Sequence, residues 1–153
     1  MLMYREEVLK AAKGRSSKTF EWLGLECRAN IMEALLKNAQ SEVLLLTRKF
    51  DIEFYAREEM VNQFLDFLQK SFTRVKVVVQ EPIEIAKHPW IVAAKTAGLS
   101  HAVTVLQANG SSADPTITFN FAVADGFAYT TEDMCAESIM KYEKGKASFF
   151  ARS

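Results

Sequence analysis

The chain has 153 residues, carries 19 basic and 19 acidic side chains, and is 49% hydrophobic. This length predicts one domain with a substantial core, and the composition excludes a disordered tail, a collagen-like fibre and a coiled-coil rod. The formal net charge of zero argues against a protein that is basic throughout, as many nucleic-acid binders are.

The first 25 residues form a less regular segment, and we expect them to be an N-terminal arm or extension. The run Lys13-Gly-Arg-Ser-Ser-Lys18 is polar and basic, and it should end any helix that begins at Tyr4. A solvated turn is the simple interpretation of this run, and a partner-docking segment is the alternative. We therefore predict an arm over residues 1–25 and a single α/β domain over residues 26–153.

From Glu26 onward the hydrophobic pattern predicts a parallel core. Apolar residues at helical spacing indicate a helix that ends near Asn38. The short apolar run Val43–Thr47 is typical of a central strand buried on both faces. An amphipathic helix over Ala56–Phe72 and a second strand over Val75–Val79 complete a right-handed βαβ unit with parallel strands.

The second half of the chain changes to the period-two pattern of antiparallel strands. The predicted elements are a short helix over Trp90–Ala97, strands over His101–Gln107 and Thr116–Ala124, a hairpin partner over Phe127–Thr130, and a final helix over about Glu132–Ala151. The pair Asp125-Gly126 is a tight-turn signal between the two hairpin strands. The predicted architecture is α/β, with the parallel βαβ core extended by an antiparallel meander.

Cysteine usage and hydropathy predict a soluble cytoplasmic protein. Cys27 and Cys135 lie far apart and outside any CxxC pattern, which is typical of reduced thiols in the cytosol. Charged residues among the first seven positions argue against a signal peptide, and no window approaches the roughly 18 apolar residues of a membrane span. We expect no membrane partner.

Common catalytic and cofactor motifs are absent from the sequence, so we predict no metal site and no cofactor. There is no GxGxxG, P-loop, HExxH or GxSxG pattern. The two histidines, His88 before a proline and His101 at the start of a strand, have no partner at motif spacing. We interpret both as structural or surface residues, with a ligand or general-base role as the alternative.

The loop after the first parallel strand carries candidate ligand-binding residues. In open α/β sheets, ligands tend to bind beyond the carboxyl ends of the parallel strands. Arg48, Lys49 and Asp51 follow the first strand at such a position. Together with His101 they are our candidate ligand-binding residues, and solvated loop charges are the alternative interpretation.

The order of these elements resembles a phospholipase D-like domain. An apolar helix precedes Ser41-Glu-Val-Leu-Leu-Leu-Thr47, and a long amphipathic helix precedes Val75-Lys-Val-Val-Val79. A short helix and a strand then lead to Phe119-Asn-Phe-Ala-Val-Ala-Asp-Gly126. The resemblance covers about residues 28–150 and implies a mixed sheet with helices on both faces.

The resemblance also aligns a degenerate version of the family's HxKxxxxD motif. In active members the His is the nucleophile, the Lys stabilises the phosphate charge and the Asp ends the strand. Aligning that Asp with Asp125 puts Asn120 at the Lys position and Thr118 at the His position, so the chain reads TxNxxxxD. Thr118 has no adjacent base in the motif and Asn120 brings no charge, so we predict no catalytic residue here.

The charge distribution around this strand argues against phosphodiester chemistry. No Lys or Arg occurs from Ser100 to Met140, whereas Asp114, Asp125 and Glu132 lie in that stretch. A phosphate bound there would meet net negative charge. The resemblance therefore implies a pseudoenzyme, a non-catalytic domain with a binding, regulatory or assembly role.

Two surfaces are candidates for assembly as a homodimer or with a protein partner. The resemblance makes pairing of single-motif members plausible. Phe20 and Trp22 lie in the N-terminal arm, and Phe149 and Phe150 lie in the predicted final helix. We expect one of these aromatic groups to form the interface.

Two alternative functions belong to other classes. A diverged phosphodiesterase or nuclease would use His101 or His88 in place of the lost nucleophile. A nucleic-acid binder would use the basic residues of the arm, with an affinity that falls steeply as salt rises. Those basic residues are Lys10, Lys13, Arg15 and Lys18.

Overall fold

The computed structural model describes residues 2–14, 19–108, 119–125, 128–133 and 144–149. Its helices are α1 (Leu2–Gly14), α2 (Gly24–Asn38), α3 (Ile52–Tyr55), α4 (Glu58–Gln69) and α5 (Pro89–Thr96), with 3-10 turns η1 (Ile85–Lys87) and η2 (Ser100–Ala102). Its strands are β1 (Thr19–Leu23), β2 (Glu42–Thr47), β3 (Arg74–Val79), β4 (Val103–Gln107), β5 (Phe119–Ala124), β6 (Ala128–Asp133) and β7 (Lys144–Phe149).

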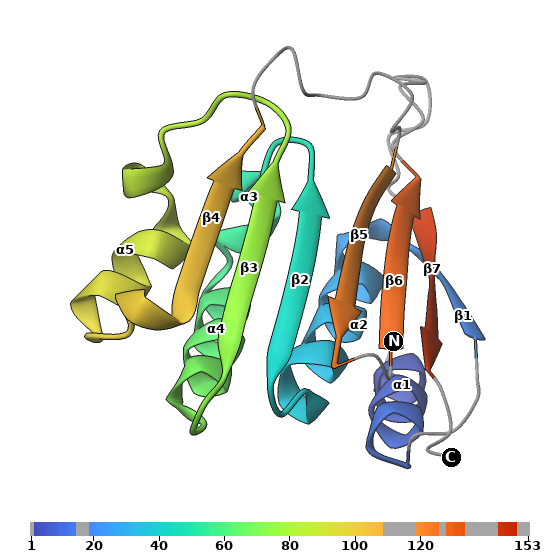
Figure 1. Ribbon diagram of the computed structural model, residues 1–153. Helices are drawn as coiled ribbons and strands as arrows, with labels where there is room; N and C mark the ends of the chain where they lie inside the picture. Colours follow the sequence, from blue (N-terminus) through green and yellow to red (C-terminus); the bar gives the residue numbers. More distant parts are fainter. Residues whose placement is uncertain (1, 15–18, 109–118, 126–127, 134–143, 150–153) are drawn as a thin grey trace.

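The strands form one mixed sheet in the order β1-β7-β6-β5-β2-β3-β4 (Figure 1). β2, β3 and β4 run parallel to one another, and β5 lies antiparallel to β2. β6, β7 and β1 continue the sheet with antiparallel pairs. The predicted α/β fold, a parallel βαβ core extended by an antiparallel meander, is therefore confirmed. The strand predicted over His101–Gln107 among the antiparallel strands is instead the parallel strand β4, because α5 forms a second crossover from β3.

The core lies between one face of this sheet and the helices. Side chains alternate between the two faces of a strand, and Val43, Leu45, Val75 and Val77 on the helix side are at most 3% exposed. The helices lie behind the sheet in the view of Figure 1, and Trp90 of α5 stacks on a phenylalanine of α4. The resemblance implies helices on both faces. Within the described residues they lie on one.

The final helix predicted over about Glu132–Ala151 is wrong. β6 extends to Asp133, and Lys144–Phe149 forms β7. β7 pairs with β6 on one side and with β1 on the other. These inter-strand hydrogen bonds outweigh the weak helix propensity of a segment that contains Gly145. Residues 134–143 of the predicted helix, and Phe150, lie outside the described residues.

Residues expected to form an N-terminal arm contribute to the same core and sheet. α1 packs against α2, and its Val8, Ala11 and Ala12 are at most 4% exposed. The helix ends at Gly14, within the basic run that predicted its end. β1 forms one edge of the sheet by pairing with β7. The division of the chain at residue 25 stays a prediction.

Candidate functional site

The carboxyl ends of β2, β3 and β4 meet at one edge of the sheet, where Arg48 and Lys49 lie. Arg48 Nε is 3.0 Å from Glu81 Oε1, which ties the loop after β2 to the loop after β3. The side-chain amide of Gln107, at the end of β4, donates to the Glu81 carbonyl oxygen at 2.6 Å. Lys49 is exposed to solvent. The edge is thus polar and connected across all three strands.

Asp51 is engaged by a buried arginine of α2. Arg28 Nη1 and Nη2 each lie 3.3 Å from one oxygen of the Asp51 carboxylate. Arg28 is 5% exposed, and its guanidinium carbon lies 3.8 Å from the ring centroid of Phe54. A bidentate carboxylate and an aromatic face are the partners that allow a guanidinium to be buried. Sequence reasoning missed Arg28, and its only local signal is a charge within the buried half of α2.

His88 has a structural environment. It is 3% exposed, its Nδ1 accepts a hydrogen bond from Trp90 N–H at 3.1 Å, and its Nε2 lies 3.0 Å from the Phe50 carbonyl oxygen. The tautomer that carries its proton on Nε2 satisfies both contacts. The imidazole also stacks on the Phe50 ring, with the two ring centroids 3.6 Å apart. Burial lowers the pKa of His88, against a smaller raising effect of the bond to Phe50.

His101 lies far from the other candidate ligand-binding residues. It is exposed in η2, directly before the start of β4. Because β2, β3 and β4 run parallel, the start of β4 is at the opposite edge of the sheet from Arg48 and Lys49. The structure therefore does not bring Arg48, Lys49, Asp51 and His101 into one site.

Asp125, which the resemblance aligned with the family's Asp, joins the end of β5 to the loop before β2. Its Oδ1 accepts from the backbone N–H of Ser41 at 3.0 Å and of Glu42 at 2.7 Å, and its Oδ2 accepts from the N–H of Gln40. Its own N–H donates to the Glu42 carbonyl at 2.9 Å. Asp125 has a φ of 49°, a left-handed conformation that Asp adopts more readily than most residues.

Lys70 donates hydrogen bonds to backbone carbonyl groups of the same loop. Its Nζ donates to the carbonyl oxygens of Lys37 and Ala39, at 2.8 and 2.9 Å, at the end of α2. Burial lowers the pKa of Lys70, while the negative charge of Asp125 raises it. Free carbonyl groups at a helix C-terminus need such donors. Lys70 and Asp125 together therefore satisfy the backbone of the turn between α2 and β2.

The remaining positions of the degenerate motif lie on or before β5. Asn120 is the Cα partner of Glu132 in the β5–β6 pair. The position at which the family has a lysine is thus in register with an acidic residue. Thr118 lies outside the described residues.

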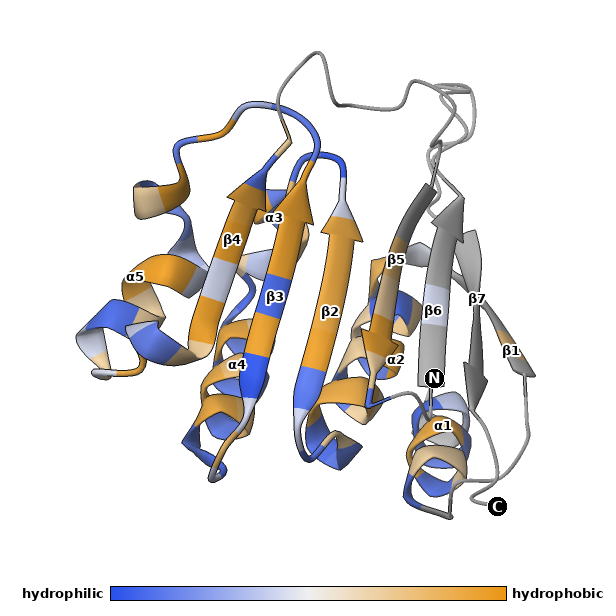
Figure 2. Cartoon of the chain, viewed as in Figure 1, coloured by the Kyte–Doolittle hydropathy of each residue, from blue (hydrophilic) through white to orange (hydrophobic). Residues whose placement is uncertain are grey.

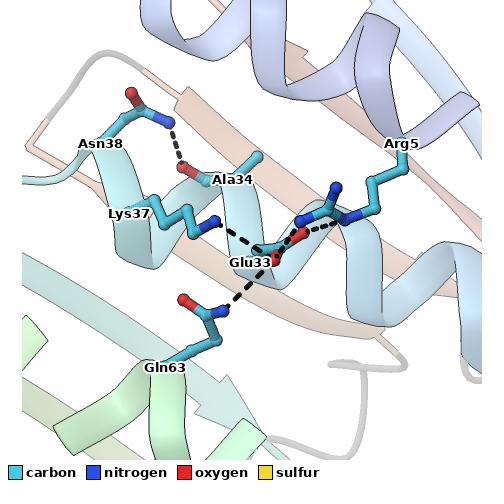
Figure 3. A network of polar contacts seen from close by, with 6 residues as sticks. All are labelled: Arg5, Glu33, Ala34, Lys37, Asn38 and Gln63. Atoms are coloured by element: carbon cyan, nitrogen blue, oxygen red, sulfur yellow. Dashed lines mark hydrogen bonds and ion pairs between the residues drawn. The ribbon is translucent and has the colours of Figure 1, made fainter. Parts of the chain in front are cut away.

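A polar network joins α1, α2 and α4 on the helix side (Figure 3). Glu33 of α2 is 9% exposed and accepts hydrogen bonds from Arg5 at 2.8 and 2.9 Å and from Gln63 at 3.2 Å. Lys37 Nζ lies 3.5 Å from the same carboxylate. The hydrogen bond to Glu33 raises the pKa of Arg5. Sequence reasoning missed this network, whose one local signal is the Glu33–Lys37 spacing.

Two further properties concern the described ranges alone. No three His, Cys, Asp or Glu side chains gather there in an arrangement that could hold a metal ion. No helix in those ranges combines the length and hydrophobicity that crossing a membrane requires.

No family model matches the sequence, and no curated protein is similar to it. Solved structures do match the fold. TrmBL2, an archaeal chromatin protein whose structure shows a novel mode of DNA binding, has 13% identity and a TM-score of 0.56 over 86% of this chain and 45% of its own. The phosphatidylserine synthase of Haemophilus influenzae Rd KW20 has 14% identity and a TM-score of 0.54 over 86% of this chain and 34% of its own.

The polyphosphate kinase of Porphyromonas gingivalis has 9% identity and a TM-score of 0.53 over 86% of this chain and 23% of its own. This chain therefore spans less than half the length of each of these proteins. At such identities the likeness concerns the fold alone. Phosphatidylserine synthase and polyphosphate kinase both have the phospholipase D fold, so the chain has an α/β fold of phospholipase D type.

Proposed function

We propose that this chain is a non-catalytic phospholipase D-like domain that works as a binding, regulatory or assembly module. The observation that carries the proposal is the environment of Asp125. Three backbone N–H groups occupy its carboxylate, so the one retained motif residue serves the turn between α2 and β2. A carboxylate held in this way is a structural group.

The engagement of the other candidate residues supports the same proposal. Arg48 pairs with Glu81, and Asp51 pairs with Arg28. A phosphoryl-transfer site needs a nucleophile and cationic groups converging on one phosphate. His101 lies at the opposite edge of the sheet from Arg48, so this pair of residues does not converge.

A phosphodiesterase assay tests the proposal against the diverged-enzyme alternative. The full chain is incubated with bis(p-nitrophenyl) phosphate, single-stranded DNA and RNA, each with and without chelator. We expect no turnover above the buffer blank. Turnover that disappears in His101→Ala, with an unchanged circular dichroism spectrum, would overturn the proposal. Thr104→Ala is the matched control, because Thr104 is also exposed near the start of β4.

Nucleic-acid binding is the second candidate function. Two observations favour it: Lys10 and Lys13 are exposed on α1, and TrmBL2, with a similar fold, is a DNA-binding protein. Fluorescence anisotropy with a labelled 20-base-pair duplex at 50 and 200 mM salt tests it. A dissociation constant that rises steeply with salt and rises again in the Lys10→Ala/Lys13→Ala variant would establish binding through α1. No binding at 50 mM salt would remove this function.

The assembly role requires point variants, because the arm cannot be deleted without damage to the core. Removing residues 1–25 would take Val8, Ala11 and Ala12 out of the buried core. Phe20, one of the aromatic residues expected at an interface, lies edge-on to Tyr4 with ring centroids 6.0 Å apart. Any test of self-association therefore has to use surface substitutions in the full chain.

A further inference from the structure

The strands β2, β3 and β4 consist mostly of apolar residues, and the described helices lie on one side of them (Figure 2). Leu44 of β2 is 36% exposed and Leu106 of β4 is 57% exposed, while Val43 and Leu45 on the helix side of β2 are buried and Val105 on the helix side of β4 is partly buried. Leu46 and Val78 on the same face are partly exposed. Parallel strands in α/β proteins are normally covered on both faces, and their apolar runs reflect this. The exposed side of β2, β3 and β4 therefore has the composition of a covered surface.

The register of the strands aligns these residues into rows. Phe121, Leu46, Val78 and Leu106 are successive Cα partners across β5, β2, β3 and β4. The next row on the same face consists of Val123, Leu44, Lys76 and Thr104. Cα partners lie on the same face of a sheet. Six of these eight side chains are apolar, the exceptions being Lys76 and Thr104, so the two rows form one mainly apolar patch, which we call the open face.

Opposite charges border the open face at the amino ends of the parallel strands. Glu42 of β2 and Arg74 of β3 are Cα partners. Both lie on the same face as the patch, because Glu42 is two residues from Leu44 and Arg74 is two residues from Lys76. Lys76 Nζ is 3.7 Å from the Glu42 carboxylate within the same chain. Arg74 is exposed. The border thus carries one acidic and two basic groups in defined positions.

We propose that a second copy of this chain packs on the open face, around a two-fold axis that runs along the strands between β2 and β3. This axis exchanges β2 with β3 and β5 with β4. Leu46 then lies over Val78 of the second copy, and Phe121 lies over Leu106 of the second copy. Glu42 lies over Arg74 of the second copy. The apolar row is matched by itself and the border charges are complementary, which a two-fold interface requires.

The charge and composition of the open face favour this occupant over others. A nucleic acid would need cations across the patch, and only Lys76 lies within it. A two-fold partner presents the same apolar row and an opposite charge over both Glu42 and Arg74, while Lys76 lies over Leu44 of the second copy. The sheets would cross at about 30°, as in aligned sheet packing, so the contacts are closest near the axis.

The size of the open face sets the expected strength. Four strands about 4.8 Å apart, with the two rows of the open face and the charged border row about 6.7 Å apart, give a footprint of about 400 Å² for each copy. Stable interfaces bury about 800 Å² for each partner. We therefore expect a dimer with a dissociation constant in the micromolar range.

Sedimentation velocity of the full chain from about 1 to 200 µM tests the proposal. We expect the wild type to shift from monomer to dimer in this range. Leu106→Glu should raise the dissociation constant at least about tenfold, because it places an unpaired carboxylate in the apolar row. Val92→Glu is the matched control, since Val92 is also an exposed apolar residue, 47% exposed, but lies on α5 on the helix side. The control should dimerise like the wild type.

A charge exchange tests the position of the axis. Glu42→Arg and Arg74→Glu should each weaken the dimer, and the double variant should restore it, because the axis pairs these two residues between copies. A wild type that stays monomeric at 200 µM, or a dimer that Leu106→Glu leaves unchanged, would overturn the proposal. This inference rests on the assembly role proposed above. Phosphodiesterase turnover would contradict that role, whereas a monomer without turnover would contradict the open-face dimer alone.

Discussion

Replacing Asp125 tests whether the retained motif residue is structural. In Asp125→Asn, one amide oxygen can still accept from Ser41 and Glu42, but the amide NH2 then faces the N–H of Gln40. Hydrogen bonds to a charged group contribute about 1.5–3 kcal/mol each, and the bonds here are exposed or partly buried, so the lower value applies. We expect this variant to lower the free energy of unfolding by about 2 kcal/mol.

Two further substitutions separate the carboxylate from the backbone conformation. Asp125→Ala loses all three hydrogen bonds and places a β-carbon at a φ of 49°, which costs about 1 kcal/mol more. Three bonds at about 1.5 kcal/mol each, together with this strain, give an expected total loss of about 5–6 kcal/mol. Asp125→Gly loses the same bonds without this strain, but glycine also has more conformational freedom in the unfolded chain. The free energy of unfolding of the glycine variant should therefore be higher than that of the alanine variant by at most about 1 kcal/mol.

Urea denaturation followed by circular dichroism at pH 7.5 measures these differences. Asp66→Asn is the control, because Asp66 is exposed on α4 and should change the free energy of unfolding by less than about 0.5 kcal/mol. An Asp125→Asn variant as stable as this control would refute the structural assignment. Loss of a measured phosphodiesterase activity without loss of stability would assign Asp125 to catalysis.

Three other substitutions test the polar network, the buried histidine and the strained turn. Glu33→Gln should lower the free energy of unfolding by about 1–2 kcal/mol, a value reduced because Arg5 is partly exposed, whereas Lys37→Ala should change it by less than about 0.5 kcal/mol; equal effects in urea denaturation would contradict the role of Glu33 as the centre of the network. The pKa of His88 is lowered in the folded protein. The contribution of His88 to the free energy of unfolding is therefore complete above the pKa of the unfolded chain, about 6.5, and is lost as the pH falls through and below that value. This loss is at most about 1.4 kcal/mol per pH unit. His88→Asn keeps an acceptor for the helix N-terminus and should show a smaller loss of stability than the wild type between pH 7.5 and 5.5, and an unchanged difference would contradict this assignment. Phe72 is 97% exposed with a φ of 61°. Asparagine tolerates this left-handed conformation better, so Phe72→Asn should raise the free energy of unfolding by about 0.5–1 kcal/mol. A lower midpoint temperature of thermal unfolding in this variant would show instead that the Phe72 ring has a packing role.

Local sequence patterns were sufficient to predict the parallel core. The apolar stripe that ends near Asn38, the run Val43–Thr47 and the run Val75–Val79 correspond to α2, β2 and β3. These elements are buried on the helix side, where hydrophobic periodicity directly reflects packing. The element order also supported the resemblance to phospholipase D-like domains, whose fold the solved structures share. Whether residues 1–25 act as a separate arm is still untested.

Only the tertiary structure decided the remaining features, because they depend on contacts between distant residues. Lys144–Phe149 is a strand since β6 and β1 both supply hydrogen-bond partners, and no local signal reports their presence. Arg28 and Asp51 are 23 residues apart in sequence and paired in space. The candidate ligand-binding residues separated because strand direction placed His101 at the opposite edge of the sheet. The sequence by itself therefore determined which segments are buried, and the three-dimensional arrangement determined which polar groups meet.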